Sequence, residues 1–142
     1  MSGKDHDSEF SKLVAIISDL RAENGCPWDR KQTPETIKKY LLEETNELAE
    51  AILKGDHDHV REEIGDLFFI LILLTKTYEE KQNFTINDVL KTIAEKMVRR
   101  HPHVFSGIKT GSESELRKQW EEIKAMEKSE QSRPGDADST SK

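Results

Sequence analysis

The sequence predicts an all-α fold, a helical bundle, on three observations. Apolar residues recur at intervals of three and four along five segments, which is the spacing of one face of a helix. Residues that cap helices stand between these segments, such as Gly25 after the first and Thr33-Pro34 before the second. No segment alternates apolar and polar residues as a half-buried strand does. We therefore expect helices packed on helices and no sheet.

Each helix is expected where its apolar stripe and its boundary residues agree. The first ends at Asn24-Gly25, the second begins after Thr33, and Gly55-Asp56 make the turn to the third. The fourth ends before His101-Pro102, and two connecting segments, 26–32 and 101–111, are interpreted as loops. The five helices are expected at residues 9–23, 34–53, 57–81, 86–100 and 112–128.

Residues 68–73 make the middle of the third predicted helix apolar on every side. A helix of this kind is buried all round. In a domain this small, such burial indicates a subunit interface as well as a core. We therefore expect a homodimer.

Length and charge restrict the class of protein. The 142 residues predict one domain at 9–128 and a disordered tail at 129–142, where apolar residues are nearly absent. A net charge of −6 argues against binding to nucleic acid. The longest apolar run, 67–74, is too short to cross a bilayer. A single cysteine, Cys26, fits a reducing compartment, so we expect a cytoplasmic protein with no membrane partner.

Two acidic clusters on neighbouring predicted helices carry the chemistry. Glu44 and Glu47 are three residues apart in the second helix, and so are Glu63 and Asp66 in the third, so each pair shares a helix face. Crowded carboxylates repel one another unless a cation lies between them. Ligands that are all oxygen favour Mg²⁺, with Mn²⁺ as a substitute.

The competing interpretation is an ordinary solvated acidic helix face. Glu44 and Glu63 argue against it, because they fall on or beside the apolar stripes of their helices. A short turn joins the two helices, which should therefore pack antiparallel and bring the clusters together. Di-iron bundles use Glu-x-x-His pairs, and no histidine here stands three residues after a helical glutamate. We therefore predict a magnesium site.

Basic and aromatic residues near the end of the chain have two possible roles. Lys96 and Arg100 are one helical turn apart, as are Trp120 and Lys124. Cations at a helix C-terminus and a core tryptophan would explain them structurally. Beside an acidic metal site, they could instead grip phosphate oxygens and stack on a base.

The loop C-P-W-D at 26–29 has no second cysteine for a redox pair or a zinc site. It is most simply interpreted as a packed loop anchor.

Taken together, these motifs resemble the MazG family of nucleoside triphosphate pyrophosphohydrolases. The matching patterns are N-G-C-P-W-D at 24–29, E-E-x-x-E at 43–47, E-x-x-D at 63–66, R-R-H-P-H-V-F at 99–105 and W-E-x-I-K at 120–124. Their order and spacing make the similarity specific, and it covers about residues 13–127. The resemblance implies an all-α, commonly dimeric enzyme that hydrolyses nucleoside triphosphates to the monophosphate and pyrophosphate with Mg²⁺.

The resemblance also implies roles for particular residues. The metal-binding acids fall on Glu44, Glu47, Glu63 and Asp66. The nucleotide contacts fall on Lys96, Arg100 and Trp120, with Lys124 nearby. Glu43 belongs to the same acidic site and is expected to orient or deprotonate the attacking water.

The family resemblance leaves the substrate open. Some members carry two copies of this domain, whereas this chain has one. A general (d)NTP pyrophosphohydrolase that clears nucleotide pools is expected, and related all-α enzymes act on dUTP, dCTP or phosphoribosyl-ATP. A non-catalytic sensor of Mg²⁺-nucleotide is the alternative from a different class.

Overall fold

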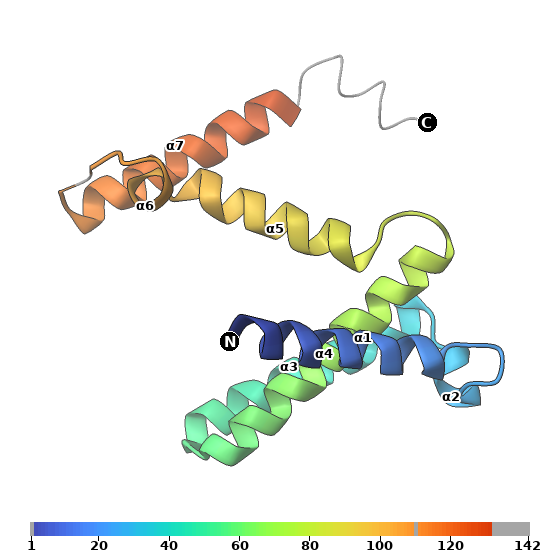
Figure 1. The fold of residues 1–142 in the computed structure, drawn as a ribbon. Helices are drawn as coiled ribbons and strands as arrows, with labels where there is room; N and C mark the ends of the chain where they lie inside the picture. The colour runs from blue at the N-terminus through green and yellow to red at the C-terminus, as the bar shows by residue number, and fades with distance from the viewer. Residues whose placement is uncertain (1, 110, 132–142) are drawn as a thin grey trace. The chain divides into compact units, whose positions relative to one another are not determined.

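Every element in the computed structural model, which describes residues 2–109 and 111–131, is a helix, as the sequence predicts (Figure 1). The chain divides between Asp88 and Val89 into two compact units. The helices are α1 Ser2–Leu20, α2 Pro27–Arg30, α3 Pro34–Lys54, α4 His57–Glu80, α5 Ile86–Arg100, α6 Pro102–Phe105 and α7 Glu113–Gln131.

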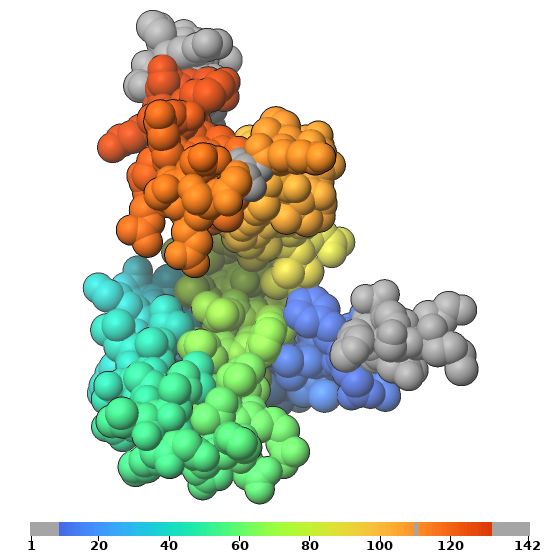
Figure 2. Space-filling view, turned by 90° about the vertical axis from the view of Figure 1, so that its left-hand side faces the viewer, coloured from blue at the N-terminus to red at the C-terminus, as the bar shows by residue number. Residues whose placement is uncertain are grey.

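The helical hairpin of α3 and α4 is the main packing unit of the first part of the chain. Figure 2 shows the two helices side by side, α3 in cyan and teal and α4 in green. Thr33 begins α3 with a reciprocal capping box to Thr36, and Pro34 takes the first position. Gly55 ends α3 with a φ of 71°, a left-handed conformation that a residue with a side chain rarely adopts.

The core of this unit lies where α1 meets the hairpin. Ile17 on α1 and Ile37 on α3 are completely buried, and Ile72 and Leu73 on α4 are nearly so. Apolar residues on each helix recur at helical spacing, so each presents a stripe to this core. The hairpin is thereby held against α1, and the acidic residues on its two facing helices are fixed on adjoining backbones.

The first predicted helix differs from the observed one at both ends. It begins at Ser2 rather than residue 9 and ends at Leu20 rather than 23. A compact turn follows, closed by a 2.8 Å bond from the Cys26 amide to the Leu20 carbonyl. A Cβ at Gly25 would lie 2.3 Å from the Leu20 carbonyl oxygen, so the turn needs glycine there. The helix therefore ends before the Asn24-Gly25 cap that the sequence predicts.

Two short helices, α2 and α6, lie in segments that the sequence predicted to be loops. Each begins at a proline whose fixed φ suits the first helical position. Four residues carry too little periodicity to be detected by pattern. At the other end of the chain, α7 runs to Gln131 rather than 128, and the rest of the predicted tail, 132–142, lies outside the described residues.

The apolar middle of α4 is buried on one side and exposed on the other. Ile70, Ile72 and Leu73 are in the core, whereas Phe68 is 49% exposed and Leu71 is 44% exposed. Burial on every side is thus not reached within one copy of the chain. None of the described helices is long and apolar enough to cross a bilayer.

Candidate metal centre

Three of the predicted acidic residues converge between the two helices of the α3–α4 hairpin. Glu44 comes from α3, and Glu63 and Asp66 come from successive turns of α4. One carboxylate oxygen from each lies within 4.8 Å of the others. Antiparallel packing of the two helices produces this arrangement, because it brings the middle of α3 beside the first half of α4.

Burial makes this cluster different from a solvated acidic surface. Glu63 is 6% exposed, and Glu44 is half-buried. The Oε2 atoms of Glu44 and Glu63 are both buried and have no hydrogen-bond partner among the described residues. A buried carboxylate oxygen without a partner costs free energy unless a proton or a cation satisfies it. Two such oxygens on facing helices fit a hard cation.

Repulsion among the carboxylates also indicates a cation site. Burial, followed by repulsion from Glu47 and the other carboxylates, raises the pKa of Glu44 to about 7. Repulsion from Glu63 is the largest cause that raises the pKa of Glu47. A divalent cation among these groups would reverse the effect by favouring their ionised forms.

The remaining predicted acids lie at the edge of this cluster. Glu47 is exposed, one turn along α3 from Glu44, and interacts electrostatically with Glu63 and Asp66. Glu43 is also exposed and precedes Glu44 directly. Neither residue is among the three whose oxygens approach most closely.

His59 adjoins the cluster, although no role is predicted for it from the sequence. Its Nε2 atom lies 3.1 Å from Oε1 of Glu63, one helical turn along α4. This contact fixes one oxygen of the Glu63 carboxylate and leaves the other without a partner. The signal that could have found it is the spacing of four residues from histidine to glutamate, whereas the Glu-x-x-His pattern of di-iron bundles has the histidine three residues after the glutamate.

In the second unit, a glutamate with no predicted role binds the predicted phosphate-contacting arginine. Glu127 Oε1 accepts bonds from Arg100 Nε at 3.2 Å and Nη2 at 2.8 Å, and Oε2 accepts one from Arg99. These contacts lower the pKa of Glu127 to about 2, chiefly through Arg100. Arg99 therefore bonds to the same carboxylate as Arg100.

The Arg100 guanidinium lies 5.2 Å from the ring centre of Trp120, so two of the predicted nucleotide-contacting residues come together. The His101 ring packs edge-on against the same tryptophan at 5.2 Å. Beside them is an open cavity of about 680 Å³, lined by Arg100, His101, His103, Leu116, Arg117, Trp120 and Glu121. The cavity combines cationic, aromatic and polar groups, which is the chemistry of an anionic aromatic ligand.

The two predicted lysines occupy neighbouring turns of these helices. Lys96 is half-buried one turn before Arg100 on α5, and Lys124 is exposed one turn after Trp120 on α7. Both lysines lie in the same unit as Arg100 and Trp120.

The fold and the site together define a class of protein: an all-α protein whose candidate metal centre consists of carboxylates on a helical hairpin. Residues 32–105 match the model of the MazG nucleotide pyrophosphohydrolase domain. The chain therefore belongs to the MazG family.

Individual relatives agree with this assignment. The chain is 50% identical over 120 residues to the uncharacterized protein YabN of Bacillus subtilis, with 84% of this chain and 24% of that one covered. It is 47% identical over 119 residues to the nucleoside triphosphate pyrophosphohydrolase/pyrophosphatase MazG of Thermotoga maritima, covering 84% and 45%. The crystal structure of a MazG-related protein from Thermotoga maritima matches with a TM-score of 0.69 and 32% identity, covering 81% and 98%. The chain thus spans less than half of these two curated relatives.

Proposed function

We propose that this protein is a Mg²⁺-dependent nucleoside triphosphate pyrophosphohydrolase that acts on (d)NTPs in nucleotide-pool clearance. It would break the bond between the α and β phosphates and release the (d)NMP and pyrophosphate, using a domain that spans residues 9–128. The names of the relatives support the class of reaction. The observation that carries the proposal is the pair of buried carboxylate oxygens without partners on Glu44 and Glu63.

Four carboxylates would hold the metal. Glu44, Glu63 and Asp66 already lie close enough to share a cation, and Glu47 is one turn from Glu44. Mg²⁺, or Mn²⁺ in its place, prefers such oxygen ligands. The bound ion would neutralise phosphate charge and lower the pKa of a water molecule bound to it.

The other predicted residues would act on the water, the phosphates and the base. Glu43, which is exposed and adjacent to Glu44, would orient the attacking water or accept its proton. Lys96, Arg100 and Lys124 would offset the negative charge that develops on the leaving pyrophosphate. Trp120, which already stacks with a guanidinium, would pack against the base.

The proposal is tested by incubating the full chain with a panel of NTPs and dNTPs in the presence of Mg²⁺. The expected products are the monophosphate and pyrophosphate, and the panel also reports whether a single base such as that of dUTP or dCTP is preferred. Release of orthophosphate would indicate cleavage at the γ position instead. Binding without any product would identify a nucleotide sensor.

A matched pair of variants links the reaction to the cluster. Asp66→Asn removes a charge from the candidate metal centre, and Glu50→Gln removes an equal charge from an exposed position on α3 outside it. Loss of one metal ligand should reduce turnover by several orders of magnitude. Turnover should survive in Glu50→Gln, and full Mg²⁺-dependent turnover in a folded Asp66→Asn protein would contradict the scheme.

We also propose that two copies of the chain associate through α4. Phe68 and Leu71 are large apolar residues whose exposure leaves one side of α4 in contact with water. Ile64, one turn before Phe68, is 42% exposed and extends the same surface. Contiguous apolar residues of this kind are typical of protein–protein interfaces.

A further inference from the structure

Trp28 is exposed although the sequence interpretation made it a packed anchor. Its relative exposure is 53%, whereas tryptophan is usually among the well-buried residues. Its ring packs against that of Tyr40 in a T-shaped arrangement, with 6.2 Å between centres, and the Lys31 ammonium lies 5.2 Å from its centre. Lys31 is itself exposed, so the ring face that it covers is open to the solvent side.

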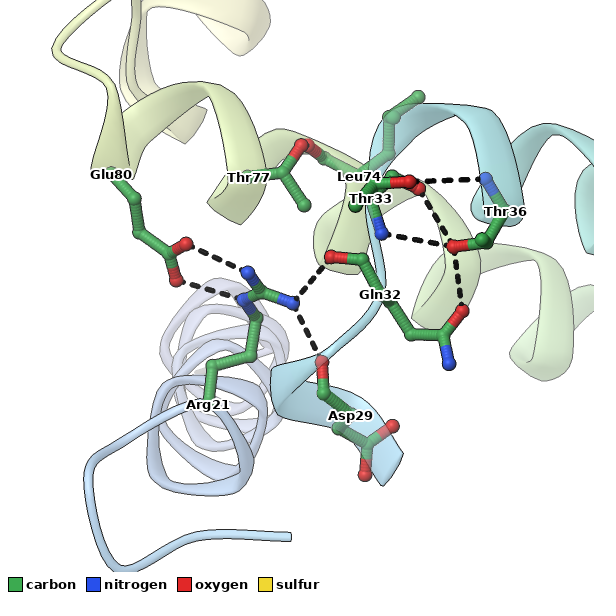
Figure 3. A network of polar contacts seen from close by, with 8 residues as sticks. All are labelled: Arg21, Asp29, Gln32, Thr33, Thr36, Leu74, Thr77 and Glu80. Carbon is green, nitrogen blue, oxygen red and sulfur yellow. Dashed lines mark hydrogen bonds and ion pairs between the residues drawn. The ribbon is translucent and has the colours of Figure 1, made fainter. Parts of the chain in front are cut away.

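The backbone next to this exposed ring is held by hydrogen bonds from Arg21 (Figure 3). Arg21 Nη1 donates to the Asp29 carbonyl at 2.6 Å and to the Gln32 carbonyl at 3.1 Å. The Gln32 side chain, which is buried, donates to the Trp28 carbonyl at 3.0 Å. An aromatic group on a fixed backbone loses little conformational entropy when a ligand packs against it. The segment thus has the properties of a preorganised binding surface.

The ring also contacts a residue on the same helix, α3, that carries Glu44 of the candidate metal centre. Tyr40, which it contacts, is on α3 one helical turn before Glu44, so the two residues share a face of that helix. One turn advances about 6 Å along the axis. A ligand held by its charged end near Glu44 could therefore extend along α3 and place an aromatic group beside Trp28. A nucleoside triphosphate has this distribution of charge and aromatic surface.

We propose that Trp28 is a second stacking surface for the base of the nucleoside triphosphate, in addition to the contact proposed for Trp120, a role that rests on the proposed function of the metal centre. Every base has a π-face, so stacking on Trp28 adds affinity without selecting one base. When the base displaces Lys31 from the ring, the lysine ammonium stays beside the ligand and favours its negative charge. The anchoring of C-P-W-D by Arg21 and Gln32 then serves to present this ring.

The test uses fluorine NMR on the full chain labelled with 5-fluorotryptophan. The sequence contains two tryptophans, so two resonances are expected, and Trp28→Phe identifies the one from Trp28. The probe is an α,β-methylene nucleoside triphosphate with Mg²⁺, which cannot be cleaved at that bond, compared with inorganic tripolyphosphate, which has no base. The Trp28 resonance should shift with the nucleotide and remain in place with tripolyphosphate.

Kinetics supply the second measurement. Trp28→Ala should raise KM for nucleoside triphosphates on the order of tenfold and leave kcat nearly unchanged, because stacking contributes equally to the ground and transition states. Trp28→Phe should recover most of the loss, and inhibition by tripolyphosphate should be the same in all three proteins.

Three outcomes would overturn the proposal. An unmoved Trp28 resonance with nucleotide bound, as measured by calorimetry, rejects stacking while leaving the pyrophosphohydrolase proposal intact. Equal shifts with nucleotide and tripolyphosphate reject a contact with the base. Absence of any nucleotide binding by the wild-type chain rejects both proposals together. The resonance test requires no substitution in the measured protein, so it stands even where Trp28→Ala fails to fold.

Discussion

The carboxylate of Glu80 pairs edge to edge with the guanidinium of Arg21. Arg21 Nε donates to Oε2 at 2.8 Å, and Nη2 donates to Oε1 at 2.7 Å (Figure 3). The remaining nitrogen, Nη1, donates to two main-chain carbonyls of the segment that carries Trp28. One side chain therefore joins the end of α1 to the end of α4 and to the loop between α1 and α3.

Replacing this arginine should destabilise the first unit measurably. Arg21→Met keeps much of the apolar stem but leaves two carbonyls and the Glu80 carboxylate without their donor. The Arg21 side chain is 9% exposed and that of Glu80 is 46% exposed. In the variant, water can therefore replace the lost hydrogen bonds at the Glu80 carboxylate, whereas it has little access to the site of the Arg21 side chain. We expect a loss of about 1–3 kcal/mol in the free energy of unfolding, measured by urea denaturation.

Arg61→Met provides the matched control. Arg61 pairs with Asp58 on α4 at 3.5 Å, and the two side chains are 83% and 88% exposed. Exposed pairs of this kind contribute at most about 1 kcal/mol, and often nothing measurable. Equal losses in the Arg21 and Arg61 variants would contradict the importance assigned to the Arg21 network.

The pair of Arg21 and Glu80 also predicts a pH dependence of stability. The hydrogen bonds from Arg21 lower the pKa of Glu80 below its ordinary value of 4.5. A depressed pKa stabilises the folded state above the unfolded-state pKa, and this contribution disappears as the pH falls through the folded-state value. The difference in unfolding free energy between wild type and Glu80→Gln should therefore be largest near neutrality and shrink below about pH 4.5. A difference that stays constant down to acid pH would contradict this.

Much of the fold could be predicted because local chemistry and tertiary packing agree. The spacing of apolar residues and the caps at Thr33 and Gly55 locate α3 and α4 within a few residues. The short helices α2 and α6 were missed, because four residues contain no helical period. The end of α1 was misplaced, since the turn that closes it depends on a main-chain contact with Gly25 rather than on a side-chain pattern.

The candidate site was partly predictable for a similar reason. Glu44 and Glu63 interrupt apolar stripes, so their burial could be inferred from sequence. The contact between Glu63 and His59 follows from helical spacing but competes with many other i, i+4 pairs. Glu127 is separated from Arg100 by 27 residues, and no local period connects them. Contacts between residues so far apart in the sequence can be identified only from the three-dimensional structure.

His59 should contribute to metal affinity through Glu63. Its Nε2 atom fixes one carboxylate oxygen at 3.1 Å, and groups that orient a ligand typically affect metal affinity by about 10- to 100-fold. We expect His59→Ala to weaken Mg²⁺ binding on the order of tenfold, measured by calorimetry. His57→Ala changes an exposed histidine in the same helical turn and should bind Mg²⁺ as wild type does. Equal affinities in the two variants would show that the contact has no such role.

The proposed association through α4 predicts a change in sedimentation. The wild-type chain should sediment as a dimer at micromolar concentration. Phe68→Glu places a charge on the exposed apolar surface and should yield a monomer, because an unpaired buried charge is costly. Met126→Glu changes a residue on α7 that is 65% exposed and should leave the dimer intact. A wild-type monomer, or a dimer that survives Phe68→Glu, would reject this interface.

The raised pKa of Glu44 predicts how Mg²⁺ and pH act together on stability. The pKa is about 7 in the folded chain against an ordinary value of 4.5, so the folded state binds the additional proton between these values. Without metal, the free energy of unfolding should therefore fall as the pH rises from 4.5 to about 7. Glu44→Gln should reduce this fall, because an amide does not titrate.

Mg²⁺ requires the ionised carboxylates, so it competes with the proton at Glu44. The rise in Tm produced by a fixed Mg²⁺ concentration should be small near pH 5 and increase through pH 7, because ligand binding to the folded state stabilises it by mass action. Differential scanning fluorimetry across this range measures the effect directly. In Glu44→Gln the rise should be smaller at every pH. A Mg²⁺ stabilisation that is independent of pH in the wild-type chain would show that the cation binds away from Glu44.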